Sequence, residues 1–385
     1  MEKKKNTPKL RFPEFTGEWE EKKLGEIFRI SAGGDIDSKH VSKERTEKFN
    51  YPIYANTERD KGLYGYSDVY KIESGVVTVT GRGVNIGIAH ARNHKFYPIV
   101  RLLVLEPLKE ENIYFYEYQI NRLNLYKEST GVPQLTAPQI SIYCVCFPQL
   151  IEQTKIATFL TAVDEKLTQL KKKKTLLEQY KKGVMQKLFS QELRFKDDNN
   201  QDFPDWEEKK LGEMGTFFSG GTPLTTKKIY YEGNIPFIRS GEINSDKTEL
   251  HISELGLVNS SAKIIEIGDL IYALYGATSG EVAISKIRGA INQAILCIRT
   301  SMINQFLCNY LILKKDIILS TYLQGGQGNL SADIIKSLII PHPSLPEQVK
   351  IANFLSAIDE KISHCSAQIE KMEAWKKGLL QQMFC

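Results

Sequence analysis

The chain has 385 residues, of which 42% are hydrophobic and 25% charged, with a formal net charge of +5. This is the composition of an ordinary soluble protein, and the length exceeds what one hydrophobic core usually serves, so we expect more than one domain. No apolar run approaches the roughly 18 residues of a membrane span, and no hydrophobic stretch follows the basic first residues. We therefore expect a cytoplasmic protein, and the basic balance is compatible with nucleic acid.

The six cysteines form no pattern typical of a metal site or of disulfides. Cys144 and Cys146 are one residue apart, the other four are scattered, and no C-x-x-C pair occurs. We therefore expect neither a zinc site nor a disulfide framework.

A short segment near the N-terminus occurs again in the second half of the chain. The segment LRFPEFTGE precedes WEEKKLGE at Trp19, and LRFKDDNNQDFPD precedes a second WEEKKLGE at Trp206. Downstream, PQLIEQTKIATFLTAVDEKL begins at Pro148 and matches PSLPEQVKIANFLSAIDEKI, which begins at Pro343. The sequence between these repeated segments differs, so constant and variable segments alternate along the chain. A repeat of this length indicates a duplicated domain rather than a solenoid.

The two variable regions, about 28–142 and 217–340, each predict a mixed α/β domain of roughly 115 to 125 residues. Both contain a strand, a glycine turn and a second strand, in SGVVTVTGRGVNIGIAHA and in GDLIYALYGATSGEVAISKI. Similar segments at their starts, ISAGGD and FSGGTP, indicate one scaffold with different surfaces. Thr136 and Ser331 are predicted to cap short helices near the ends of the two regions.

Each downstream constant segment predicts a long helix with a narrow apolar seam. Apolar residues recur at alternating spacings of four and three, which is typical of a coiled coil. Each helix would run about 35 residues, or roughly 50 Å, and so narrow a stripe needs a partner, most simply the other copy. The seam residues that we expect to pair are Ile156, Leu160, Val163, Leu167 and Leu170, and Ile351, Leu355, Ile358, Ile362 and Ile369.

Three lysines, Lys174, Lys181 and Lys376, interrupt this seam. Two interpretations are open: the apolar stems snorkel near the helix ends, or the charges set the pairing register. We favour snorkelling, because it is the simpler explanation.

Motifs of several enzyme classes are absent from the chain. It contains no G-x-x-x-x-G-K-[ST], no H-E-x-x-H, no nucleophile elbow and no Pro-Pro motif of the kind that amino-methyltransferases use. The glycines of GRGVNIG, from Gly81 to Gly87, predict a hairpin loop rather than a dinucleotide site. We therefore expect no catalysis by this chain alone.

Side chains that can read bases or bind phosphates gather in glycine-rich loops of both variable regions. Arginine pairs with guanine, asparagine and glutamine pair with adenine, and lysine suits phosphates. For any one residue an ordinary loop role is the simpler interpretation, but the grouping in two domains indicates DNA. The candidates are Asn56, Arg59, Lys61, Tyr64, Tyr66, Arg82, Asn85, Arg92 and Asn93 in the first region, and Thr222, Lys227, Lys228, Arg239, Ser240, Tyr275, Thr278, Asn292, Gln293, Gln324 and Gln327 in the second.

The whole chain resembles the specificity (S) subunit of type I restriction-modification systems. The resemblance rests on the two lead-ins and on the start of each constant helix, where Leu/Pro-Glu-Gln is followed by Ile-Ala-x-Phe-Leu and Asp-x-Lys. Ile151 stands where the second copy has Pro346, which is a small departure. The matching residues are Glu152, Gln153, Ile156, Ala157, Phe159, Leu160, Asp164 and Lys166, and Glu347, Gln348, Ile351, Ala352, Phe354, Leu355, Asp359 and Lys361.

This resemblance implies an α+β fold with a pseudo-two-fold internal repeat. Two mixed α/β target-recognition domains would be separated by two conserved helices that pair as an antiparallel coiled coil. The expected segments are a first recognition domain with its lead-in, a first helical spacer, a second recognition domain and a second spacer. Their boundaries are 1–147, 148–192, 193–341 and 342–385.

The resemblance also implies partners. Each domain would bind one half of a bipartite site in double-stranded DNA, in the bacterial cytoplasm at the nucleoid. Two methyltransferase (M) subunits would carry S-adenosylmethionine and methylate adenine N6. Restriction (R) subunits would use ATP and magnesium for cleavage, so this chain itself needs no cofactor.

Three other interpretations compete with this one. A stand-alone DNA-binding regulator would more often show a helix-turn-helix and a single copy of its repeat. A structural coiled-coil adaptor has no reason to carry divergent domains with base-reading side chains. A fused methyltransferase is opposed by the absent catalytic motifs.

Overall fold

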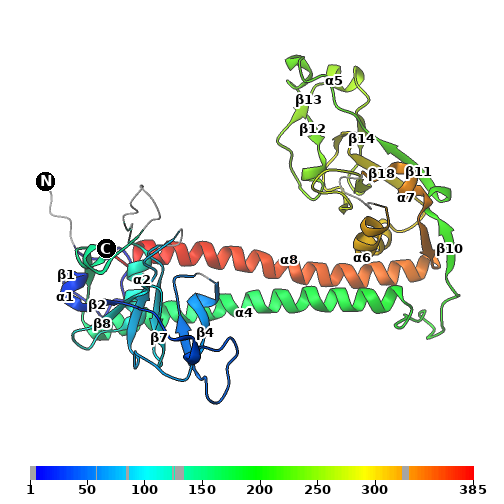
Figure 1. The fold of residues 1–385 in the computed structure, drawn as a ribbon. Coiled ribbons are helices and arrows are strands. Elements are labelled where there is room, and N and C mark those ends of the chain that lie inside the picture. The colour runs from blue at the N-terminus through cyan, green and yellow to red at the C-terminus, as the bar shows by residue number, and fades with distance from the viewer. Residues whose placement is uncertain (1–5, 58, 84–85, 124, 126–133, 323–328) are drawn as a thin grey trace. The chain divides into compact units, whose positions relative to one another are not determined.

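The computed structural model describes residues 6–57, 59–83, 86–123, 125, 134–322 and 329–385 (Figure 1). The chain divides into two compact units, one formed by Met1–Lys171 with Ala367–Cys385 and the other by Lys172–Ser366. Each unit contains one variable region and part of each long helix. No helix in the described part of the chain is both long and apolar enough to cross a membrane.

The variable region of the first unit contains two small sheets. Its strands are β2 (Phe28–Ala32), β3 (Tyr51–Tyr54), β4 (Leu63–Ser67), β5 (Val76–Val79), β6 (Ala89–Arg92), β7 (Tyr97–Pro98) and β8 (Leu103–Pro107). Strands β2, β8, β5 and β6 form, in that order, a four-stranded antiparallel sheet. Strands β4, β3 and β7 form the other sheet, in which β3 and β7 run parallel. The β-branched residues of β5 are all buried, which suits the middle of a packed sheet.

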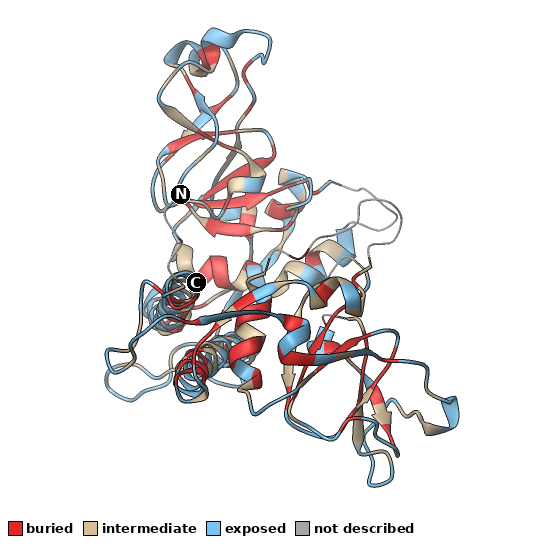
Figure 2. Ribbon diagram, turned by 90° about the vertical axis from the view of Figure 1, so that its left-hand side faces the viewer, coloured by how far each residue is buried: buried red, intermediate tan, exposed pale blue. Residues whose placement is uncertain are grey.

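The second unit repeats this arrangement, with a fourth strand, β14 (Lys263–Ile265), added to the sheet that contains the parallel pair. Its strands are β11 (Gly215–Ser219), β12 (Ile235–Ile238), β13 (His251–Ile252), β14 (Lys263–Ile265), β15 (Leu270–Ala273), β16 (Val282–Ile284), β17 (Gly289–Ile291) and β18 (Ile295–Thr300). One sheet has the order β11-β18-β15-β16, and the other has the order β13-β12-β17-β14. Strands β12 and β17 are parallel, as β3 and β7 are in the first unit. Buried residues, red in Figure 2, run along the strands of each unit.

Short helical elements connect these strands. They are η1 (Ser38–His40), η2 (Arg59–Gly62), α2 (Ile113–Asn121) and α3 (Ala137–Ser141) in the first unit, and η4 (Lys228–Tyr230), η5 (Ser240–Glu242), α5 (Glu254–Val258), α6 (Asn304–Tyr322) and α7 (Ala332–Ser337) in the second. The predicted caps are confirmed, because the Thr136 hydroxyl accepts from Gln139 N and the Ser331 hydroxyl accepts from Ile334 N.

The repeated octapeptide forms the same small structure in both units. Its EEKK residues form the edge strands β1 (Glu20–Lys23) and β10 (Glu207–Lys210), which pair with β9 (Cys144–Phe147) and β19 (Ile339–His342) respectively. Its leucine is buried in the turns α1 (Leu24–Ile27) and η3 (Leu211–Glu213). A Cβ atom added at Gly25 or at Gly212 would lie 2.9 Å from a neighbouring side chain, so glycine permits close packing there.

Two long helices, α4 (Leu150–Phe189) and α8 (Leu345–Gln382), carry the constant segments. In the first unit the start of α4 packs against the end of α8, and Leu160 and Leu379 share one core. In the second unit the end of α4 packs against the start of α8, and Leu188 and Leu355 share one core. The helices are therefore antiparallel, and the predicted fold class is confirmed.

Most of the expected seam residues are buried, namely Ile156, Leu160, Val163, Leu170, Ile351, Leu355 and Ile358, whereas Leu167, Ile362 and Ile369 are half-buried. The helices lie inside the expected spacers, 148–192 and 342–385. The boundaries of the two compact units nevertheless differ from those of the four expected segments, because each unit includes part of both helices.

The preferred interpretation of two seam lysines is wrong. Lys181 Nζ lies 2.7 Å from Asp359 Oδ1, and Lys376 Nζ lies 2.5 Å from Asp164 Oδ1. These ammonium groups form ion pairs between the helices instead of snorkelling to water, because an aspartate of the facing helix lies within reach. Lys174 differs, since its Nζ lies 3.8 Å from Glu178 on its own helix.

A buried glutamate at the start of each long helix binds the repeated lead-in. In the first unit the Arg11 guanidinium donates to both oxygens of Glu152 at 2.7 Å, and Trp19 Nε1 donates to the same carboxylate at 3.3 Å. This hydrogen bond with Glu152 raises the pKa of Arg11 above its ordinary value. Phe12, which follows Arg11, packs edge-on against Phe159 of the helix with ring centroids 5.8 Å apart.

The second unit has the same contacts. Arg194 donates to the two oxygens of Glu347 at 3.1 and 3.0 Å, and Trp206 Nε1 donates to Glu347 at 2.9 Å. Phe195 packs against Phe354 with centroids 5.5 Å apart. The repeated Leu-Arg-Phe, tryptophan and glutamate therefore form one joint, which we call the lead-in joint of each unit.

Candidate nucleic-acid interface

In the first unit, loops from separate parts of the sequence meet at one edge of the four-stranded sheet β2-β8-β5-β6. We define its loop cluster as residues 33–35, 55–56, 80–83, 86–88 and 99–102. Gly33 N donates to Leu102 O at 2.8 Å, and Gly81 N donates to the Asn56 carbonyl oxygen Oδ1 at 2.7 Å. Arg101 N donates to Gly33 O at 3.0 Å. The Asn56 amide also donates to Val100 O, so together these bonds hold four loops against one another.

The second unit has the corresponding loop cluster, which we define as residues 220–222, 239–240, 274–281 and 292–294. Leu274 N donates to Ala294 O at 2.8 Å. The Thr222 hydroxyl donates to Gln293 Oε1 at 2.6 Å. The structure therefore brings together candidates that are far apart in the sequence.

Strand registers show which positions correspond in the two loop clusters. Ala32 pairs with Leu103 at the end of the β2–β8 ladder, and Ser219 pairs with Leu296 in the β11–β18 ladder. Tyr54 pairs with Pro98, and Ile238 pairs with Ile291 in the parallel ladders. Ala32 therefore corresponds to Ser219, Tyr54 to Ile238 and Pro98 to Ile291. The same number of residues after each of these positions, Asp35 corresponds to Thr222, Asn56 to Ser240 and Val100 to Gln293.

The two central hairpins also correspond residue by residue. Gly87 N donates to Thr80 O at 2.8 Å, and Gly280 N donates to Ala273 O at 2.9 Å. Arg82 therefore occupies the position of Tyr275. The glycines at the two bends, Gly83 and Gly87 against Gly276 and Gly280, all have φ between 82 and 92°, a region that favours glycine. The backbone scaffold is thus shared, and the side chains on it differ.

Two of the candidate residues brace the first domain from inside. The Asn56 amide donates to Val100 O and accepts from Gly81 N, so both of its ends are used. Arg92 is 4% exposed, donates to the Thr78 hydroxyl at 3.0 Å and lies 3.6 Å above the Tyr54 ring. Burial lowers the pKa of Arg92 from its ordinary value. In this conformation neither side chain is free to contact DNA.

Arg239 is held by two carboxylates. Its Nε donates to Glu242 Oε2 at 3.1 Å, and its Nη2 donates to Glu249 Oε2 at 2.6 Å. The hydrogen bond with Glu242, followed by that with Glu249, raises the pKa of Arg239. The guanidinium would have to leave one of these partners before it could bind a base.

The remaining candidates divide by exposure. Arg59, Lys61, Tyr64, Arg82, Asn93, Thr222, Lys227, Lys228 and Gln293 are exposed, and Tyr66, Ser240, Tyr275, Thr278 and Asn292 are half-buried. Asn292 uses its Oδ1 to accept from Ala294 N at 3.1 Å, which shapes its turn. Asn85, Gln324 and Gln327 lie outside the described residues.

Several exposed candidates lie away from the loop clusters. Arg59 and Lys61 belong to η2, in the hairpin between β3 and β4. Lys227 and Lys228 lie at η4, where Lys227 Nζ contacts the Tyr230 hydroxyl at 3.2 Å. These lysines and arginine suit phosphates rather than the same base edges as the loop clusters.

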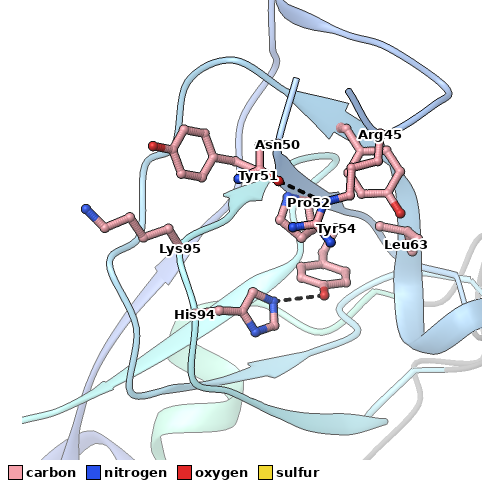
Figure 3. A pocket seen from close by; sticks show the side chains of 9 residues that line it. Arg45, Asn50, Tyr51, Pro52, Tyr54, Leu63, His94 and Lys95 are labelled. Carbon is pink, nitrogen blue, oxygen red and sulfur yellow. Dashed lines mark hydrogen bonds between the residues drawn. The ribbon is translucent and has the colours of Figure 1, made fainter. Parts of the chain in front are cut away.

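A pocket of about 420 Å³ opens in the first unit (Figure 3). Tyr54 and His94 face each other inside it, with the Tyr54 hydroxyl 2.9 Å from His94 Nε2. Burial, and then the charge of Arg92, lower the pKa of His94, so the imidazole is neutral at physiological pH. Arg45 donates to Asn50 Oδ1 at 2.8 Å at the rim. The pocket is lined by Arg45, Asn50, Tyr51, Pro52, Tyr54, Leu63, Tyr66, His94 and Lys95.

Sequence reasoning overlooked Arg101. It is exposed in the turn between β7 and β8, beside Val100 and within the loop cluster. The run YPIVRLLVLE contains no glycine, asparagine or aspartate that would mark a turn with positive φ. The only available signal was an arginine placed directly before an apolar strand.

Within the described residues, no group of three or more histidines, cysteines, aspartates or glutamates is placed to hold a metal ion. The polar side chains of the loop clusters are instead donors and acceptors of the kind that bind base edges and phosphates.

Comparison with known proteins adds independent information. A family model described as the type I restriction modification DNA specificity domain matches residues 16–179 and again 204–374. A putative type I restriction enzyme specificity subunit from Methanocaldococcus jannaschii is 24% identical, over 98% of this chain and 95% of its own length. A putative type I specificity subunit from Mycoplasma pneumoniae is 32% identical over 36% of this chain and 41% of its own length.

The fold is also similar to a solved structure. The crystal structure of a type I restriction-modification system S subunit from M. genitalium aligns with a TM-score of 0.69, over 98% of this chain and 99% of that chain. The sequence identity is 17%, so this likeness concerns the fold.

Proposed function

The chain belongs to the family of type I restriction modification DNA specificity subunits, and from this premise we propose that each of its two domains binds one half of a split DNA site. The family match occurs twice, once in each unit, so the chain has two target-recognition domains. Its role in such a system is to specify the DNA sequence.

The observation that carries the proposal is the pair of loop clusters on one shared scaffold. Equivalent backbone positions hold Asp35 and Thr222, Arg82 and Tyr275, and Val100 and Gln293. A protein that read the same half-site twice would need the same side chains at these positions. Different side chains on one backbone suit two half-sites with different sequences.

Exposed cations outside the loop clusters support the same proposal. Arg59 and Lys61 in the first domain and Lys227 and Lys228 in the second are all exposed. We assign them to the DNA backbone, where such residues set position rather than sequence. Binding through them should weaken as salt concentration rises, because counterions are released from the DNA.

We assign the chemistry to partner subunits. Two methyltransferase subunits would carry S-adenosylmethionine, and restriction subunits would use ATP and magnesium. The two lead-in joints support two identical partners, because each places the same arginine, tryptophan and glutamate against one end of a long helix. In a bacterial cell the assembled complex would lie at the nucleoid through its DNA.

The test is methylation mapping by long-read sequencing in a methyl-deficient host. The host expresses this chain with its methyltransferase subunit, and the control strain lacks only this chain. We expect a split motif methylated on adenine that depends on the chain. A soluble complex that methylates no motif would contradict the proposal and favour a stand-alone regulator or a structural adaptor.

A further inference from the structure

A reverse turn in the first loop cluster has an unusual backbone for its residues. Leu102 N donates to Ile99 O at 3.1 Å, and the two central residues, Val100 and Arg101, have φ of 52° and 57°. Positive φ at both central positions is the pattern of a type I′ turn, which glycine, asparagine and aspartate dominate. Valine is β-branched and disfavours this region strongly. The turn therefore stores strain.

Neighbouring loops hold this strained turn in place. Val100 N donates to Gly34 O at 3.1 Å, Arg101 N donates to Gly33 O at 3.0 Å, and the Asn56 amide donates to Val100 O. A Cβ atom added at Gly81 would lie 3.0 Å from Arg101 O, so the two backbones touch. Strain that the surroundings over-determine in this way is typical of functional sites.

The corresponding turn in the second unit is relaxed. Ile295 N donates to Asn292 O at 3.2 Å, which closes a turn at the same place. Its central residues, Gln293 and Ala294, are not among the residues with positive φ. The fold therefore does not require the left-handed turn, and its presence in the first unit belongs to that domain alone.

The strained turn places Arg101 against the loop that carries a second arginine, Arg82. A Cβ atom added at Gly81, the neighbour of Arg82, would lie 3.0 Å from Arg101 O, and both arginines are exposed. In the described part of the chain no carboxylate forms an ion pair with either guanidinium, whereas Arg239 and Arg299 are each held by acidic residues. The equivalent positions in the second unit, Ala294 and Tyr275, carry no charge.

We propose that Arg101, presented by the strained turn together with Arg82, reads guanine in the half-site of the first domain. Arginine binds guanine O6 and N7 with two hydrogen bonds, which is the commonest specific contact in the major groove. A rigid turn fixes the backbone from which the arginine extends, so no loop-ordering entropy is lost on binding and only the side chain has to become ordered. This inference rests on the proposed function, because it names the base class that one of the two loop clusters recognises.

The test compares Arg101→Gly and Arg101→Lys with the unchanged chain, each in complex with the methyltransferase subunit. Glycine suits positive φ and removes only the side chain, so the turn should remain folded. Lysine keeps the charge but cannot form the planar fork. Arg29→Ala is the matched control, because Arg29 is exposed on β2 of the same domain and outside the loop cluster.

Methylation at every single-base variant of the split motif is then measured by long-read sequencing. We expect both Arg101 variants to lose about 5- to 150-fold discrimination at one G·C pair of one half-site. The other half-site and the Arg29→Ala profile should be unchanged. Full discrimination in either Arg101 variant, or an even loss at every position, would overturn the inference. Absence of any split motif with the unchanged chain would instead refute the proposed function.

Discussion

At the scale of single residues, two buried glutamates explain why the lead-in segments are repeated. Glu152 is 3% exposed and Glu347 is fully buried, and each carboxylate binds an arginine and a tryptophan from a lead-in. A buried carboxylate without such partners would be very unfavourable. The arginine, the tryptophan and the glutamate therefore depend on one another, which accounts for their appearing together in both copies.

The residue-scale prediction concerns Glu347→Gln. The amide removes the negative charge while keeping the shape, so Arg194 loses its buried counter-charge. We expect a loss of about 3 kcal/mol or more in the free energy of unfolding, because breaking one side of a buried ion pair is strongly destabilising. The measurement is urea denaturation of the full chain, followed by tryptophan fluorescence, since Trp206 is in the joint.

Glu207→Gln is the matched control, because Glu207 forms an exposed pair with Lys209 at 2.7 Å. Exposed pairs of this kind contribute little, so the midpoint should hardly move. A shift with Glu347→Gln no larger than that of the control would show that the lead-in joint is not a source of stability.

At the scale of elements, the antiparallel register of the long helices depends on charges as well as on the apolar seam. Lys181 meets Asp359 in one unit, and Lys376 meets Asp164 in the other. Both lysines and both aspartates occupy equivalent places in the two repeats. A register slip by one turn would separate both pairs at once and would bury unpaired charges against the seam.

The element-scale prediction is a charge exchange between the helices. Lys181→Asp alone sets two carboxylates against each other and should lower the urea midpoint of the full chain. Adding Asp359→Lys restores opposite charges and should recover most of the loss, with a coupling free energy of about 1 kcal/mol.

The matched cycle at Lys376 and Asp164 should behave in the same way, because that pair occupies the equivalent place in the repeat. Additive effects in both cycles would mean that the ion pairs do not contribute to helix pairing.

At the scale of the whole molecule, the chain consists of two copies of one plan. The order of the four-stranded antiparallel sheet, the parallel strand pair, the capped short helix and the lead-in joint all occur twice. The loop clusters carry different side chains in the two copies. This division predicts that each recognition domain can be exchanged independently of the other.

The whole-molecule prediction is an exchange of residues 28–142 for the equivalent region of another family member. The joints and helices remain, so the complex should assemble, and one half-site of the methylated motif should change while the other is kept. Methylation mapping gives the result, and a sizing column gives the state of assembly. A change in both half-sites, or failure to assemble, would contradict modular recognition.

Much of the candidate interface could not be predicted from residue types. Asn56 and Arg92 suit base recognition in the sequence, yet the structure uses them as internal braces. Arg239 is bound by two glutamates, one of them ten positions further along the chain. Arg101 was missed because its turn is stabilised by bonds to the loops after β2 and after β3, which are distant in sequence.

The sequence by itself determined the architecture: the repeat, the hairpins, the capped helices and the two seamed helices. These features depend on periodicity, glycine and local hydrogen bonds, which neighbouring residues encode. Only the tertiary structure decided which side chains are free. Lys181 pairs with an aspartate of the other helix, and Arg101 stands in a strained turn, because loops and helices far apart in sequence meet there. Whether a charge is paired depends on those long-range contacts, which cannot be predicted from a local sequence pattern.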